Sequence, residues 1–213
     1  MEKGDQDSTK EEVILRAAMD VFVEKGWAGA RMQEIADRAK INKALLHYYF
    51  RSKENLYDRI IETVFTFFFR QIEEALQPED SFELVLRHFI DAIVDTIAEN
   101  PRIPQFVMHE LSQGGGNAMR ILTKVIGKGG ITLPQRMYAL VRGELDAGRI
   151  RPVNPPQLII TILGACIYYF VMEPIVSTVI AHVDAGATYD RRSFVAERKE
   201  AIFDVVYYGI KKR

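Results

Sequence analysis

The sequence has almost no cysteine and no early proline, and both absences narrow its function. Cys166 is the single cysteine among 213 residues, so the chain can form neither an internal disulfide nor a cysteine-based zinc or iron–sulfur site. We therefore expect a reducing compartment, the cytoplasm. No proline precedes residue 78 and no Asn-Gly or Asp-Gly dipeptide occurs, so the strongest short hairpin signal is missing.

A leader sequence and a membrane span are not expected either. The N-terminus from Met1 to Glu12 is polar and acidic, without the apolar centre of a signal peptide. The apolar run from Leu158 to Met172, closed by Glu173 and Pro174, contains no charged residue. It is shorter than the roughly 18–20 residues that a spanning helix needs. We interpret it as a buried helix of a protein that does not contact a membrane.

The sequence also lacks the overall basic charge that is usual in nucleic-acid-binding proteins. The formal net charge is -1. The charge is unevenly distributed, however, because the window from Lys25 to Lys53 contains seven basic residues and only two acids, which gives +5 there and -6 elsewhere. Such a window is a plausible electrostatic footprint for a DNA duplex. A solvated charged face is the alternative interpretation.

Apolar residues repeat at helical spacing nearly throughout the chain, which predicts an all-α protein. Ser and Asn residues at several helix starts, and Gly26 at the end of the first helix, add capping signals. The predicted helices cover residues 8–26, 32–39, 43–49, 52–76, 81–100, 104–113, 118–126, 133–147, 156–183 and 190–211.

Two of these helices are short and joined by a three-residue turn, which is the pattern of a helix-turn-helix. In that motif the second helix enters the major groove while the first crosses the backbone. Asn42 is positioned to cap the second helix, and Ser52 the long helix that follows. Leu46 and Phe50 are expected to lie in the core with Ile35 and Ala39.

The region from Ile14 to Leu56 resembles the DNA-binding region of the TetR family of bacterial transcriptional regulators. The joint spacing of the matching residues is specific, and the chain length and the helical remainder also fit that family. The residues that carry the resemblance are Ile14-Leu15, Ala17-Ala18, Phe22, Gly26-Trp27, Glu34-Ile35-Ala36, Lys43, Leu46, Tyr49-Phe50 and Ser52-Lys53-Glu54-Asn55-Leu56.

The resemblance implies a role for each residue of the second helix. Lys43 and Ala44 stand where the family meets base edges, and Leu45 could contact a thymine methyl group. Asn42 is implied to cap the helix and touch a phosphate. The residues implied to lie along the DNA backbone are His47, Tyr48 and Tyr49, with Lys53 binding phosphate at the next helix N-terminus.

Two residues depart from the family pattern. Arg31 stands where the family has Ser or Thr as the cap of the first motif helix, and its side chain has no acceptor with which to cap. It could contact a phosphate instead. Lys40 stands where the family often has Gly in the turn. Either the turn differs here, or a non-glycine residue tolerates a positive φ at a cost of about 1 kcal/mol or more.

The larger C-terminal part is expected to bind a ligand and to pair two subunits. The long helix after Ser52 carries Val64, Phe65 and Phe67 to Phe69 and should be buried from several sides. The resemblance implies a homodimer through the last two helices and a pocket for a small molecule. An aromatic, mostly apolar set of residues could line that pocket: Phe106, His109, Glu110, Tyr138, Thr161, Tyr168 and Tyr169.

The sequence contains none of the motifs that we would expect of an enzyme or a metal-binding site. Gly114 to Gly116 is not followed by the Lys-Ser/Thr of a phosphate loop. No nucleophile elbow occurs. His88 and Asp91 have no third metal ligand at suitable spacing. We expect neither catalysis nor a cofactor.

The sequence therefore predicts a DNA-binding domain over residues 1–55 and a ligand-binding and dimerisation domain over residues 56–213. The protein is expected to be a transcriptional regulator that binds double-stranded operator DNA as a dimer and is released by a small-molecule effector. Repression is the commoner mode of regulation in the resembled family, so we expect a repressor. A helical interaction module or small-molecule-binding bundle without DNA binding, and a bundle-class enzyme, are the alternatives.

Overall fold

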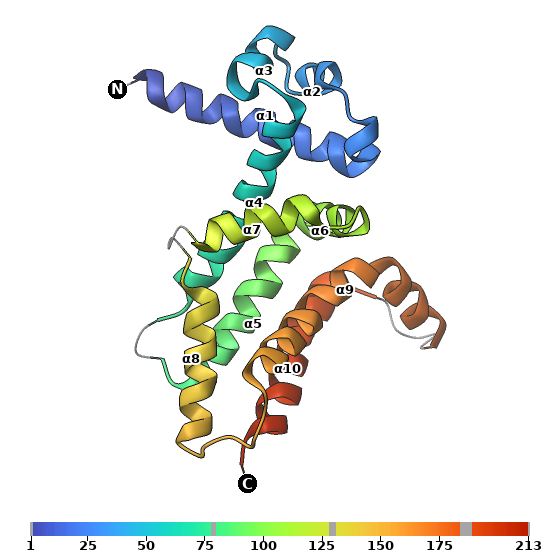
Figure 1. The fold of residues 1–213 in the computed structure, drawn as a ribbon. Coiled ribbons are helices and arrows are strands. Elements are labelled where there is room, and N and C mark those ends of the chain that lie inside the picture. Colours follow the sequence, from blue (N-terminus) through green and yellow to red (C-terminus); the bar gives the residue numbers. More distant parts are fainter. Residues whose placement is uncertain (1, 78–79, 128–130, 184–188, 213) are drawn as a thin grey trace. The chain divides into compact units, whose positions relative to one another are not determined.

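The computed structural model describes residues 2–77, 80–127, 131–183 and 189–212, with side chains from Lys10 onward. These residues form helices and, apart from a single bridge between Ile150 and Lys211, no β-structure, as the apolar periodicity predicts. The helices are α1 (Glu2–Gly29), α2 (Met32–Arg38), α3 (Lys43–Phe50), α4 (Lys53–Ala75), α5 (Phe82–Glu99), α6 (Arg102–Ser112), α7 (Gly116–Gly127), α8 (Leu133–Asp146), α9 (Pro155–Val183) and α10 (Arg191–Ile210) (Figure 1).

Helix boundaries agree with the sequence pattern to within a few residues except at the start of α1. That helix begins at Glu2 rather than near Thr9, since the preceding polar residues contain no proline to stop it. Gly26 interrupts α1 with φ 68° and ψ 177°. The predicted positive φ is therefore present, and the chain makes one further turn to Gly29. The predicted break at 127–130 lies, beyond Gly127, outside the described residues.

The chain divides into two compact units. The first contains α1, α2, α3 and the part of α4 up to Thr66, together with α6 and α7. The second contains the rest of α4 with α5, α8, α9 and α10. This spatial division differs from the predicted boundary after residue 55, because α4 continues through that point and α6 packs against α1. Sequence periodicity identifies the apolar face of a helix but not the distant helix that packs against that face.

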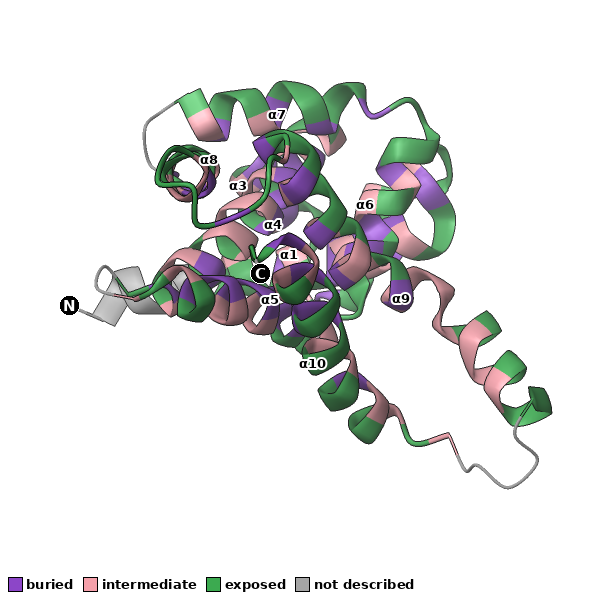
Figure 2. Cartoon of the chain, turned by 90° about the horizontal axis from the view of Figure 1, so that it is seen from below, coloured by how far each residue is buried: buried purple, intermediate pink, exposed green. Residues whose placement is uncertain are grey.

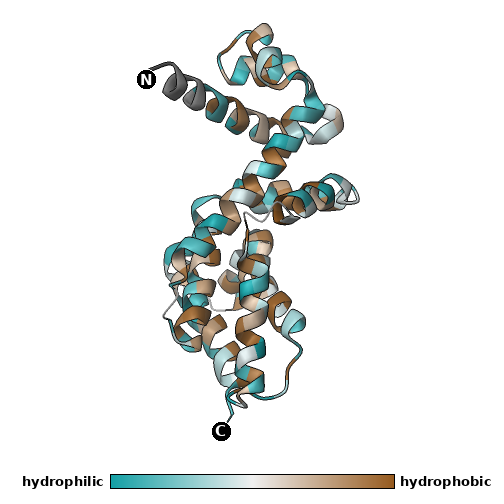
Figure 3. Cartoon of the chain, turned by 60° about the vertical axis from the view of Figure 1, so that its left-hand side comes forward, coloured by the Kyte–Doolittle hydropathy of each residue, from teal (hydrophilic) through white to brown (hydrophobic). Residues whose placement is uncertain are grey.

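In the first unit, the apolar faces of α1 and the short helices meet in one core. Ile14, Phe22, Ile35 and Leu46 are fully buried, and Phe50 is 6% exposed. Brown and teal segments alternate along the visible turns of α1 in Figure 3, as expected of an amphipathic helix. The predicted core of the helix-turn-helix, including Ala39, is confirmed.

Two apolar helices are less buried than the sequence predicts. On α4, Val64 is 5% exposed, but Phe67 is 37% exposed. On α9, the buried residues lie on one face only, and none occurs after Tyr169; Figure 2 shows the C-terminal part of α9 in pink and green. The helix as a whole is 29 residues long, and by length and composition alone it is apolar enough to cross a membrane. Within the described residues of one chain, α9 is therefore buried on one face only, and its other apolar face is left uncovered.

Candidate nucleic-acid interface

α2 and α3 form a helix-turn-helix whose caps follow the sequence signals. The side chain of Asn42 accepts a hydrogen bond from the Leu45 amide at 2.7 Å, and Ser52 accepts one from the Asn55 amide at 3.2 Å. Arg31 precedes α2 without any side-chain cap, as its lack of an acceptor requires. Lys40 adopts φ 54°, so this non-glycine residue does occupy the left-handed region.

α3 has two opposite faces. Leu46 and Phe50 are buried, while the residues one turn apart on the other side, Lys43, Ala44, His47 and Tyr48, are exposed. Tyr48 is 76% exposed and packs edge-on against Tyr49, which is half-buried with Leu45. His47 Nδ1 lies 3.1 Å from the Arg51 carbonyl oxygen. The structure thus gathers the predicted α3 residues on one accessible surface.

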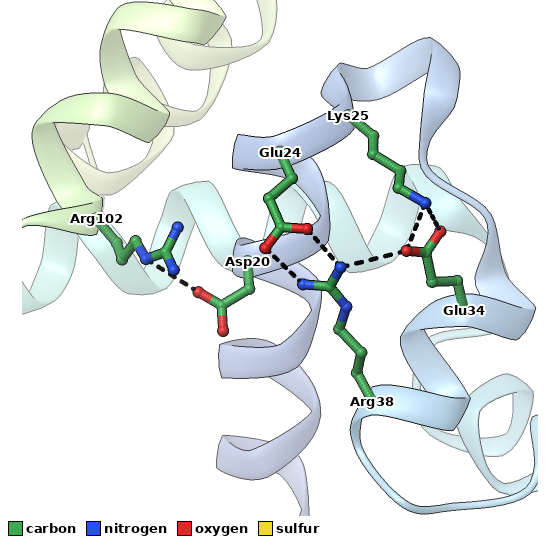
Figure 4. A network of polar contacts seen from close by, with 6 residues as sticks. All are labelled: Asp20, Glu24, Lys25, Glu34, Arg38 and Arg102. Carbon is green, nitrogen blue, oxygen red and sulfur yellow. Dashed lines mark hydrogen bonds and ion pairs between the residues drawn. The ribbon is translucent and has the colours of Figure 1, made fainter.

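Not all basic residues of the 25–53 window belong to that surface. Lys25 pairs with Glu34 at 2.7 Å. Arg38 donates through Nη1 to Glu24 at 2.7 Å and also contacts Glu34 at 3.3 Å. Figure 4 shows these pairs joining α1 to α2, with Asp20 and Arg102 beside them. The hydrogen bonds from Arg38 and Lys25 lower the pKa values of Glu24 and Glu34, respectively.

Lys53 also has a role that the sequence does not reveal. The sequence predicts a phosphate contact, but the Lys53 ammonium donates to the carbonyl oxygens of Trp27 and Ala30, at 2.5 and 3.0 Å. It also lies 4.5 Å from the centre of the Trp27 ring. Contact with phosphate would require Lys53 to leave these carbonyls. In this conformation it ties the end of α1 to the start of α4.

Four cations of the window are exposed, and no side-chain partner for them occurs among the described residues: Arg31, Lys40, Lys43 and Arg51. Lys40 and Arg51 were counted in the basic window but are absent from the sequence-based set of DNA contacts. Positive charge is the one feature of the sequence that marks these two residues for DNA binding. Arg51 ends α3 with φ 59°, at the same end as His47.

The residues predicted to line a ligand pocket do not form one group. In the first unit, Phe106 and Glu110 border a small cavity between α4, α6 and α7. His109, their neighbour, instead packs over Gly26, and its Nε2 is buried without a hydrogen-bond partner.

The other ligand candidates lie in the second unit, on α8 and α9. Tyr138 and Tyr168 are 47% and 62% exposed, and Thr161 is exposed and donates to the Gln157 carbonyl. Tyr169 is buried and its hydroxyl bonds to that of Tyr189. A cavity of about 640 Å³ in this unit is lined by none of the candidates. It lies where the start of α5 meets the end of α10.

Comparison with known proteins agrees with this geometry. Residues 14–60, which contain the helix-turn-helix, match the family model of bacterial regulatory proteins of the tetR family. Over this region the chain is similar to the TetR family of transcriptional regulators. It is 26% identical over 206 residues to the HTH-type transcriptional regulator RutR of Escherichia coli, covering 97% of this chain and 92% of the relative. It is also 26% identical to the HTH-type transcriptional repressor NicS of Pseudomonas putida, covering 86% and 87%.

Solved structures show the same fold over nearly the whole chain. A tetR-family regulatory protein from Rhodococcus superposes with a TM-score of 0.70 at 18% identity, covering 92% of this chain and 96% of that one. A TetR-family regulator from Haemophilus influenzae gives a TM-score of 0.68 at 17% identity, with coverages of 97% and 99%. The predicted fold class and the predicted function as a DNA-binding transcriptional regulator are confirmed.

Proposed function

We propose that this TetR-family regulator is a cytoplasmic homodimer that represses transcription by binding operator DNA through α3 and leaves the DNA when a small molecule binds. The exposed face of α3, with unpaired cations around it, is the observation that carries the proposal. Duplex binding draws most of its affinity from phosphate neutralisation and its specificity from base edges. The name of the NicS relative, a repressor, supports the sign of regulation.

Each exposed α3 residue has a proposed contact. Lys43 and Ala44, in the first turn of α3, meet base edges, and the half-buried Leu45 beside them meets a thymine methyl group. Asn42 combines its cap with a phosphate contact. The residues proposed to lie along the DNA backbone are Arg31, His47, Tyr48 and Tyr49, to which the structure adds Lys40 and Arg51.

The open face of α9 supports a dimer through the last two helices. Five apolar residues of α9 are each at least 51% exposed: Ile160, Tyr168, Ile175, Val179 and Val183. The steps between them are eight, seven, four and four residues, which is close to whole helical turns. They form an apolar stripe along α9. On α10, Val205 and Tyr208 are 77% and 65% exposed. A second copy of the chain would cover these faces with an isologous interface, as two half-sites on DNA require.

The dimer is tested by placing a charge in the stripe. Tyr168→Glu would bury an unpaired carboxylate in the interface, and we expect it to convert the dimer to a monomer in sedimentation velocity. Tyr138→Glu changes an exposed tyrosine on α8 that lies outside the stripe; this variant is the control and should remain dimeric. A dimeric Tyr168→Glu variant would contradict the proposed interface.

A salt titration of operator binding tests the proposed DNA contacts. Operator fragments are first selected from genomic DNA near 0.1 M salt. Arg31, Lys40 and Arg51 give at most six phosphate contacts per dimer, so the slope of log K against log salt should be about -5. An absence of sequence-selective binding, or a slope near zero, would refute the function.

Two substitutions separate base-facing from phosphate-facing residues. Lys43→Ala should reduce the ratio of operator to random-DNA affinity, because it removes a base-edge contact. Lys40→Ala should weaken both affinities about equally and reduce the slope by about two units per dimer, since each subunit loses one phosphate contact. Identical behaviour of the two variants would show that the assigned roles are wrong.

A further inference from the structure

Glu110 is a buried carboxylate without a cationic partner. It is 5% exposed and accepts hydrogen bonds from the Tyr57 hydroxyl at 2.6 Å and the Ala118 amide at 3.1 Å. No Lys, Arg or His side chain among the described residues pairs with it. A buried charge without a counter-charge is unfavourable. Two hydrogen bonds leave part of the acceptor capacity of this carboxylate unused.

The same carboxylate borders the small cavity of the first unit. Apart from Glu110, the residues around that cavity are apolar: Ile61, Val64, Phe65, Phe106, Val107 and Ala118. The cavity volume is about 10 Å³, roughly the space of one water molecule. The Glu110 carboxylate favours a cationic ligand. Aromatic ring faces also attract cations, so Phe65 and Phe106 favour a cation as well. An anion would meet repulsion from Glu110.

We propose that the effector of this regulator is a small organic cation whose ammonium group pairs with Glu110 while its apolar body lies between Phe65 and Phe106. This inference rests on the proposed function, which supplies the effector but not its chemistry. The charge of Glu110 selects for a cation, and the apolar wall selects for a hydrocarbon body. Neutral analogues keep the apolar contacts and lose the ion pair.

The cavity is too small for such a ligand until α4 separates from α6 and α7. The Tyr57 hydroxyl on α4 bridges that gap by its hydrogen bond to Glu110, and the ammonium competes with it for the same carboxylate. A ligand that binds only the widened conformer shifts the population toward it.

Tyr57 connects this cavity to the helix-turn-helix. Its ring packs edge-on against Trp27, with centroids 4.9 Å apart, and against Phe22 at 4.8 Å. The Trp27 carbonyl is one of the two that hold the Lys53 ammonium. Displacement of Tyr57 therefore disturbs the contacts that position the end of α1, which leads directly into α2.

Trp27 is the only tryptophan in the sequence, so its fluorescence reports on Tyr57. The full-length protein is titrated with benzylamine, benzyl alcohol and benzoate, which share one ring and differ in charge. We expect a saturable change in Trp27 emission with benzylamine, a response at least about tenfold weaker in affinity with benzyl alcohol, and none with benzoate. Equal responses to all three compounds, or no saturable response to millimolar benzylamine, would overturn the proposal.

Two variants distinguish ligand recognition from a structural cap. Glu110→Gln keeps a side-chain acceptor for Ala118 but removes the charge, and should weaken benzylamine binding at least about tenfold. Tyr57→Phe removes the competing hydroxyl and should strengthen binding. Glu197→Gln, at an exposed α10 site, is the matched control. An unchanged benzylamine affinity in folded Glu110→Gln would show that Glu110 only caps α7. If that variant does not fold, an unchanged or weaker affinity in Tyr57→Phe overturns the proposal.

Operator binding is measured separately on the same samples. Charge-selective binding at Glu110 without any operator binding would refute the regulator function and leave the cation site standing. Operator binding without charge selectivity would refute the cation site alone. Release of operator DNA by benzylamine, and by neither analogue, would support both.

Discussion

Lys53 provides the sharpest test of the structure, because its sequence-based role and its structural role predict different results. Lys53→Met removes two hydrogen bonds to the carbonyls of Trp27 and Ala30 and a cation–π contact with the Trp27 ring. Each hydrogen bond contributes about 1 kcal/mol net, and a partly exposed cation–π contact about 0.5 kcal/mol. The expected loss in the free energy of unfolding is therefore about 2.5 kcal/mol, or about 5–10 °C in Tm for a chain of this size.

Thermal and urea unfolding, followed by far-UV circular dichroism and Trp27 fluorescence, measure this loss. Lys43→Met is the matched control, because Lys43 is exposed and its ammonium has no partner among the residues that the structure describes. Its stability should change by no more than about 0.5 kcal/mol. If Lys53→Met is as stable as Lys43→Met and differs from the wild type only in DNA affinity, Lys53 is free to bind phosphate and the internal contacts contribute nothing.

Three other substitutions and one thiol measurement test local features of the structure. Gly26→Ala should cost about 2 kcal/mol or more of unfolding free energy, since φ is +68° and its Cβ would lie 2.8 Å from His109 Nε2. Lys40→Gly should raise stability slightly, by about 0.5 kcal/mol, because it relieves a positive φ. Asn42→Ala should lower it by about 1 kcal/mol through loss of the α3 cap. Burial raises the pKa of the Cys166 thiol to about 12, so the native thiol should not react with a disulfide reagent at pH 8 but should react once urea unfolds the chain. The stabilisation from its raised pKa is complete below pH 9 and is lost as the pH rises toward 12. Rapid reaction of native protein would contradict that burial.

The local features of the fold followed from the sequence because the forces behind them are local. The caps at Asn42 and Ser52 and the buried face of α3 each depend on residues within one or two turns. Backbone strain at Lys40 is also local. The sequence has lysine where the resembled family often has glycine in the turn, and Lys40 adopts the positive φ that glycine would adopt there.

Long-range pairings could not be predicted from the sequence. Arg38 finds Glu24 on α1, fourteen residues away, and Lys53 finds carbonyls 23 and 26 residues earlier. The sequence places both cations in the basic window that predicts DNA binding, because a count of charges contains no information on their partners. Glu110 is the opposite case: a glutamate is expected at the surface, yet α4 and α7 bring it a hydroxyl and an amide.

The basic residues of the 25–53 window fall into two groups with different effects on DNA binding. Three of its seven basic residues serve the protein itself, since Lys25 and Arg38 hold α2 on α1 and Lys53 holds the end of α1. Positive charge in this region therefore contributes in two ways: some residues fix the orientation of α3, and others face outward from it. Substituting the first kind would alter DNA binding by displacing α3, while substituting the second kind would alter it by removing counterion release. Only the second kind should change the salt dependence in proportion to the charge removed.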